Sequence, residues 1–182
     1  MELRKWRGNF FEANPEAGKT VLGLTWSTET DCLSLVVPKD DQKGNGSWSR
    51  RSLLKAVASL FDPLGFAAPV QLTGKILLEI AWQESNCWDE QLSDDLQARI
   101  STWWGELRKV VTVEVPRWIG CQPGQPVVLH AFSDASEVAY GAAVYLFTMN
   151  GCNLLMAKTK VAPLKPQTLP RLELQALCLA TY

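Results

Sequence analysis

Two acidic residues of this sequence, Asp134 and Glu173, stand where a strand and a helix could bring them together around a metal ion. Asp134 follows the apolar segment 127–132, which is typical of a buried strand, in the motif F-S-D-A-S. Glu173 lies early in a predicted helix, beside its apolar face, in P-R-L-E-L-Q-A-L. Converging carboxylates repel one another unless a cation lies between them, and their oxygens suit Mg²⁺ or Mn²⁺. Metal-activated hydrolysis of a phosphodiester is the chemistry that such a pair would serve.

Each acid also has a simpler interpretation when it is taken alone. Asp134 could be a turn aspartate that caps a loop, and Glu173 could be a solvated surface residue. The pairing of the two favours the metal interpretation, although two carboxylates are fewer than a complete metal site needs.

The elements that must position these acids follow a boundary at 121–126, C-Q-P-G-Q-P, where the character of the sequence changes. Three predicted strands come next, at 127–134, 139–147 and 153–160, and the last two are separated by an Asn-Gly turn. A proline-containing loop then leads to the helix that carries Glu173. The sequence therefore predicts a three-strand meander followed by one helix.

The segment before this boundary predicts a β-hairpin and a set of helices. The hairpin pairs Val21–Trp26 with Cys32–Val37, and the loop Pro38–Ser47 after it is predicted to lie on the surface. The predicted helices run from Ser49 to Leu60 with an apolar face of Leu53, Leu54, Val57, Ala58 and Phe61, from about Pro69 to about Glu84, and from Ser93 onwards through Leu96, Ile100, Trp103, Leu107 and Val110. Trp103 and Trp104 are expected in the core rather than on a base-stacking surface.

Composition excludes several classes of protein. The formal net charge of −1 gives no overall basic footprint for nucleic acid, and five dispersed cysteines with a single histidine argue against a disulfide framework or a zinc site. That histidine, His130, is expected to be a packed strand residue on the face of Asp134. No apolar run spans a membrane and the first residues do not form a signal peptide, so an intracellular, cytoplasmic protein is expected.

Several motifs, in their order along the chain, closely resemble the Pao/BEL-type retrotransposon polyprotein. They are V-L-G-L-T-W at 21–26, A-S-L-F-D-P-L-G-F-A-A-P at 58–69, F-S-D-A-S-E-V-A-Y-G-A-A-V-Y at 132–145, A-K-T-K-V-A-P-L at 157–164 and L-P-R-L-E-L-Q-A at 169–176. The resemblance runs from about Thr20 to the end of the chain.

The resemblance implies an α+β fold in which a linker at 1–19 precedes two regions. Residues 20–120 would hold a reverse-transcriptase hairpin and a helical region like the thumb and connection. Residues 127–182 would begin a truncated ribonuclease H-like domain with a three-strand meander and its first helix. The resemblance implies that Asp134 matches the first catalytic aspartate and Glu173 the helix glutamate, both of which would be metal ligands.

The intact parent would use Mg²⁺ or Mn²⁺ to hydrolyse RNA in RNA–DNA hybrids, besides reverse transcription, and would lie in a cytoplasmic virus-like particle. The remaining acidic ligands and the polymerase Y-x-D-D motif are absent from this sequence. The chain alone is therefore expected to be inactive and to bind no metal tightly. Its expected partners, reached through the parent, are an RNA–DNA hybrid or primer–template, with no membrane.

Two other functions stay open at this stage. The region is often labelled as the peptidase of such elements, but an aspartic peptidase needs D-[ST]-G, and this sequence has none. Alternatively the chain is a non-catalytic connector that contacts nucleic acid. Its candidate phosphate contacts are Arg50, Arg51 and Lys55 in the first helix, and Lys158, Lys160 and Arg171 near the acids.

Overall fold

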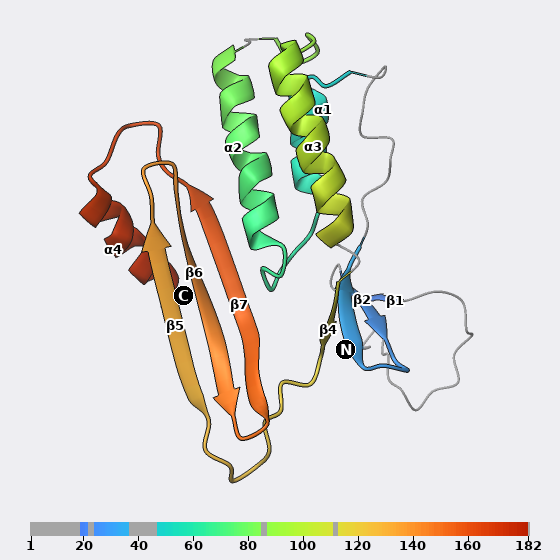
Figure 1. The fold of residues 1–182 in the computed structure, drawn as a ribbon, viewed down its shortest axis with the longest axis vertical. Helices are drawn as coiled ribbons and strands as arrows, with labels where there is room; N and C mark the ends of the chain where they lie inside the picture. Colours follow the sequence, from blue (N-terminus) through green and yellow to red (C-terminus); the bar gives the residue numbers. More distant parts are fainter. Residues whose placement is uncertain (1–18, 22–23, 37–46, 85–86, 111–112, 182) are drawn as a thin grey trace, which may run out of the picture.

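The computed structural model describes residues 19–21, 24–36, 47–84, 87–110 and 113–181. The predicted linker at 1–19, apart from Lys19, and the predicted surface loop at 38–47, apart from Ser47, lie outside these residues. The described chain is α+β, as the sequence predicts, and Figure 1 shows a helical bundle, a small sheet and a long sheet that carries one further helix. None of the described helices is long and apolar enough to cross a bilayer.

The small sheet is antiparallel and has the strand order β1-β2-β3-β4. Its strands are β1 (Lys19–Val21), β2 (Leu24–Ser27), β3 (Cys32–Leu35) and β4 (Glu114–Pro116). The predicted hairpin is confirmed in β2 and β3, but the predicted first strand is divided into β1 and β2, which pair with each other. Strand β4 was not predicted, because a strand of three residues that ends in Pro116 is too short to show an alternating pattern.

Asp31 fastens β4 to the turn between β2 and β3. Its carboxylate accepts hydrogen bonds from the Arg117 guanidinium, at 2.6 and 3.0 Å, and from the indole nitrogen of Trp26, at 3.0 Å. The Arg117 guanidinium also lies over the Trp26 ring, 5.2 Å from its centroid. Hydrogen bonds from Arg117 and then from Trp26 favour the ionised carboxylate and lower the pKa of Asp31 below its usual value.

The three predicted helices are present as α1 (Arg50–Ser59), α2 (Ala68–Glu84) and α3 (Asp94–Val110). Ser49 caps α1 as predicted, because its side chain accepts a hydrogen bond from the Ser52 backbone nitrogen. The Ser93 hydroxyl likewise accepts from the backbone nitrogen of Leu96 at 3.4 Å. The first turn of α3 is acidic and its last turn is basic, which suits the helix dipole.

Tryptophans form the centre of the helical core. Trp103 and Trp104 are 2% and 6% exposed, which confirms them as core residues, and Trp48 meets Trp104 edge to face at 5.9 Å. The predicted apolar face of α1 is only partly correct, because Leu54 and Phe61 are 38% and 59% exposed and Ala58 is exposed as well. The stripe that α1 buries is narrower and includes Leu53, Ala56 and Leu60, with Val57 partly buried against the core.

The long sheet is the predicted three-strand antiparallel meander, of order β5-β6-β7. Its strands are β5 (Val128–Ala135), β6 (Ala139–Thr148) and β7 (Gly151–Val161), and α4 (Leu169–Leu179) packs on β5 and β6. The prediction that 127–132 is a buried strand is wrong, since every residue from Val128 to Asp134 is exposed. Strand β5 is an edge strand, and among the described residues no strand covers its outer side.

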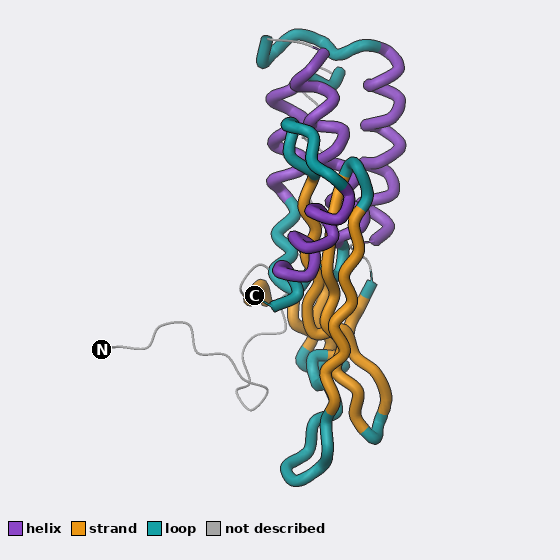
Figure 2. Tube along the Cα trace, turned by 90° about the vertical axis from the view of Figure 1, so that its left-hand side faces the viewer, coloured by secondary structure: helices purple, strands orange, loops and turns teal. Residues whose placement is uncertain are grey.

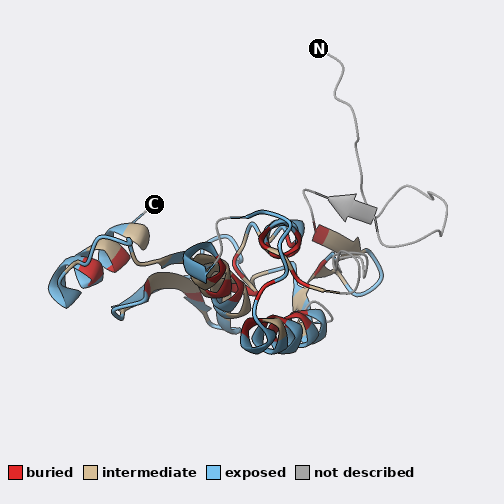
Figure 3. Cartoon of the chain, turned by 90° about the horizontal axis from the view of Figure 1, so that it is seen from above, coloured by how far each residue is buried: buried red, intermediate tan, exposed pale blue. Residues whose placement is uncertain are grey.

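The helices and the long sheet form an elongated molecule, with α1–α3 beyond and beside one end of the strands (Figure 2). Buried residues gather within the bundle and on one side of α4 (Figure 3). Contacts between the two parts run along β7, which α2 approaches. None of the five cysteines, all of which lie in the described part of the chain, forms a disulfide, and four of them are exposed.

Candidate metal site

Asp134 is the penultimate residue of β5, so its carboxylate stands at the carboxyl end of an exposed edge strand. Its Oδ1 accepts a hydrogen bond from the backbone nitrogen of Ala135 at 2.9 Å. The turn that follows is closed by Ser136, whose backbone nitrogen donates to the carbonyl of Ala139 at 2.8 Å and whose hydroxyl accepts from the Ala139 nitrogen at 3.2 Å. The end of the strand that presents Asp134 is therefore held by local hydrogen bonds.

The strand register decides which residues share a face of the sheet with Asp134. Gly141 of β6 lies opposite Asp134, and Thr159 of β7 lies opposite Gly141. Since cross-strand partners point to the same face, these three residues form one row. A Cβ atom at Gly141 would come 3.0 Å from the Thr159 Cγ2 atom, so the glycine lets the two strands keep this row closely packed.

Alternation along β5 places His130 and Phe132 on the same face as Asp134. The prediction that His130 shares this face is supported by the register, but the residue is exposed rather than packed inside. Its ring lies 4.3 Å from that of Phe147 and 6.4 Å from that of Phe132, which in turn meets Tyr145 edge to face at 5.9 Å. Next to Asp134 the face is therefore aromatic.

Glu173 lies in the second turn of α4, which begins after Thr168 and carries a proline in its first turn, as helix starts often do. Leu172 and Ala176 are the buried residues of α4. Glu173 comes directly after Leu172 and three residues before Ala176. It therefore borders the packed side of the helix and remains exposed. Its carboxylate is available to a ligand beside the sheet.

Helix α4 packs against β5 and β6, and Figure 1 shows it beside the end of β5 where Asp134 stands. The two predicted acids thus belong to neighbouring elements at one end of the sheet. In the part of the chain that the structure describes, no group of three or more His, Cys, Asp or Glu residues could hold a metal ion. Asp134 and Glu173 would supply two oxygen donors of a site that needs more.

The predicted phosphate contacts are scattered. Lys158 and Lys160 alternate with Thr159 on β7, so they point to the face opposite Asp134. Arg50 is only 3% exposed, with its guanidinium 3.9 Å from the Trp82 ring centroid, so it does not present itself to a phosphate. Arg51 binds Asp89 through two hydrogen bonds of 2.6 and 3.1 Å, and the exposed Arg171 lies on α4.

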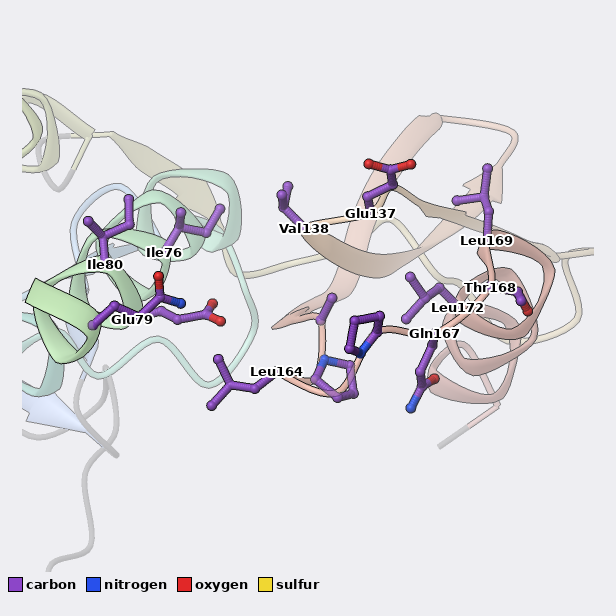
Figure 4. A pocket seen from close by; sticks show the side chains of 14 residues that line it. Ile76, Glu79, Ile80, Glu137, Val138, Leu164, Gln167, Thr168, Leu169 and Leu172 are labelled. Atoms are coloured by element: carbon purple, nitrogen blue, oxygen red, sulfur yellow. The ribbon is translucent and has the colours of Figure 1, made fainter.

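A hollow of about 690 Å³, which the sequence did not indicate, lies between α2 and the start of α4 (Figure 4). Leu164 reaches towards α2 from the loop before α4, and Glu79 reaches towards it from α2. Glu137, from the turn after Asp134, is the other acid of a lining that is otherwise apolar or uncharged. Two acids without a cation do not suit a phosphate backbone. The F-S-D-A-S-E motif contains Glu137, but its sequence position alone does not indicate this hollow.

The second part of this α+β chain is a meander whose first strand has an acid as its penultimate residue, followed by a packed helix that bears a second acid. This arrangement is consistent with a ribonuclease H-like fragment. The family model described as "Pao retrotransposon-like RNaseH-like domain" matches residues 49–182, and the chain belongs to this family. The match begins at the residue that caps α1, so it includes the helical bundle as well as the long sheet and α4. Among curated proteins no match was found.

Proposed function

We propose that the chain is part of a Pao/BEL-type retrotransposon Pol polyprotein whose intact form performs reverse transcription and hydrolyses RNA in RNA–DNA hybrids. In this proposal Asp134 and Glu173 supply two of the carboxylates of the hydrolytic metal site. The observation that carries it is the packing of α4, which bears Glu173, against β5, whose penultimate residue is Asp134. The family to which residues 49–182 belong is consistent with this role.

The residues present fit a hard cation, because both donors are exposed carboxylates at one end of the sheet. The hydrogen bond from the Ala135 nitrogen restrains one oxygen of Asp134 and leaves the other for a ligand. Leu172 and Ala176 are the buried residues of α4, which packs on β5 and β6, so Glu173 between them is held beside the sheet. When bound, Mg²⁺ or Mn²⁺ would activate a water molecule and stabilise the leaving oxygen. With two protein ligands, we propose that this chain binds the ion weakly and is inactive alone.

Calorimetric titration of the chain with Mn²⁺ tests this proposal. We expect weak binding, with a dissociation constant of roughly 10⁻³ M, because two carboxylates hold a hard ion less firmly than a complete set. Asp134→Asn and Glu173→Gln should each weaken Mn²⁺ binding about tenfold or more. Each substitution keeps the size of the side chain but removes its negative charge.

The matched control is Glu137→Gln, which removes a nearby exposed acid of the same turn and should leave the titration unchanged. If Asp134→Asn and Glu173→Gln titrate like the unsubstituted chain, the two acids do not form a site.

A connector that contacts nucleic acid is the second candidate function. The observation that favours it is the exposed pair Lys158 and Lys160, which share one face of β7. This function would appear as binding of primer–template that falls steeply with salt and that survives Asp134→Asn. No observation in the structure favours the aspartic peptidase, whose signature would be self-cleavage lost in Asp134→Asn.

A further inference from the structure

The motif at 58–69 folds into a turn that Asp62 holds together. The Asp62 carboxylate accepts hydrogen bonds from the backbone nitrogens of Gly65, Phe66 and Ala67, at 2.8, 3.0 and 2.8 Å. These nitrogens lie just before α2, where helix starts leave donors without partners. Asp62 therefore fixes both the turn and the start of α2.

This turn contacts β7 within another of the motifs that resemble the family, residues 157–164. The backbone nitrogen of Ala157 donates to the carbonyl of Leu64 at 2.9 Å, and the Thr159 hydroxyl donates to the carbonyl of Ala68 at 3.2 Å. Gly65 lies against Ala157 with φ +77°, and a Cβ there would come 1.9 Å from the Ala157 carbonyl oxygen. Both the backbone conformation and the space at residue 65 therefore require glycine.

A second segment, residues 119–120 between β4 and β5, contacts the chain at the start of β7. The side-chain nitrogens of Asn150 and Asn153 donate to the carbonyls of Gly120 and Ile119, at 3.3 and 3.2 Å. The outer edge of β7 is thus bonded through its backbone at Ala157, and side chains at its start make further contacts. Strand β5, the other edge strand, is exposed from Val128 to Asp134. An edge strand with bare backbone groups invites pairing with another chain.

We infer that the turn from Asp62 to Ala67 is a joint that closes the outer edge of β7 and holds the helical bundle against the long sheet. The joint contacts Thr159, which forms one row across the strands with Gly141 and with Asp134 of the candidate site. The motifs at 58–69 and 157–164 are far apart in sequence, but they contact each other at this joint. The contact does not depend on whether Asp134 binds a metal.

Amide hydrogen exchange of the full chain tests the joint with a matched pair of glycines. Gly65→Ala and Gly124→Ala both place a side chain at a positive φ, +77° and +82°, but a Cβ at Gly124 meets nothing within 4 Å. Exchange at the Ala157 amide should become at least about tenfold faster in Gly65→Ala than in Gly124→Ala, because only the former forces β7 away. Equal exchange in the two variants would overturn the inference.

A milder variant keeps the test decisive if Gly65→Ala does not fold. Thr159→Val preserves the branched shape of the side chain and removes only its hydrogen bond to Ala68. We expect exchange at the Ala157 amide to rise about fivefold, the effect of one net hydrogen bond. Unchanged exchange there would contradict a joint at this position.

Discussion

Trp103→Ala should lower the free energy of unfolding by about 3–5 kcal/mol, the usual loss when a buried tryptophan is truncated. Trp103 is 2% exposed and its indole nitrogen donates to the Val70 carbonyl at 2.8 Å. Its ring also fills the space above Gly74, where a Cβ would come 2.3 Å from the ring. The substitution therefore opens a cavity between α2 and α3 and removes a hydrogen bond that joins them. Urea denaturation followed by far-ultraviolet circular dichroism measures the loss.

Trp118→Ala is the control for this prediction, because Trp118 is 54% exposed. Its free energy of unfolding should stay within about 0.5 kcal/mol of the unsubstituted chain. Equal losses for the two substitutions would show that the bundle does not depend on the contact between α2 and α3.

Glu173→Gln should slow hydrolysis of the RNA strand of an RNA–DNA hybrid by more than about a hundredfold in a longer polyprotein that completes the acidic set. Residues that only support a metal ligand cost about 10- to 100-fold when they are replaced, and a direct ligand should cost more. Glutamine keeps the size of the side chain and its position beside Leu172, but it loses the charge that attracts the ion. The measurement is the rate of hybrid cleavage as a function of Mg²⁺ concentration.

Glu137→Gln in the same polyprotein serves as the control and should leave the rate within a few fold. Glu137 is exposed and lies near Asp134, but it lines the hollow beside α2. The proposal fails if hydrolysis and its metal dependence survive Glu173→Gln.

Elements with a strong local pattern could be predicted from the sequence. Helix α3 begins after Ser93 and buries Trp103 because its cap, its charges and its apolar spacing all agree. The meander was predictable from its turns, since Asn150 and Gly151 mark the hairpin between β6 and β7. These signals are local, so they need no knowledge of the tertiary contacts.

Features that depend on distant segments could not be predicted. Strand β4 pairs with β3, and Arg117 next to it bonds Asp31, although the whole helical region separates these segments in sequence. The side chains of β5 are exposed, whereas the apolar composition of this strand alone predicted burial. The joint between Gly65 and β7 was also missed, because a turn motif carries no information about its partner strand.

In the candidate site, too, features with a local pattern were predictable and features that depend on tertiary contacts were not. Asp134 at a strand end and Glu173 beside a buried helix face were predictable from local patterns, and the structure puts their elements in contact. Charge type alone did not predict the positions of the basic residues. The Arg50 guanidinium packs against the Trp82 ring. The register of β7 directs Lys158 to the face of the sheet opposite Asp134.

Paramagnetic broadening by Mn²⁺ in the nuclear magnetic resonance spectrum of the isotope-labelled chain tests the shared metal site most directly. A small amount of Mn²⁺ should first broaden the amide signals of Asp134, Ala135 and Glu173 together, and Asp134→Asn should abolish this pattern at both elements. Broadening that begins instead at Glu79 and Glu137 in the hollow, and that persists in Asp134→Asn, would contradict a metal site formed by Asp134 and Glu173.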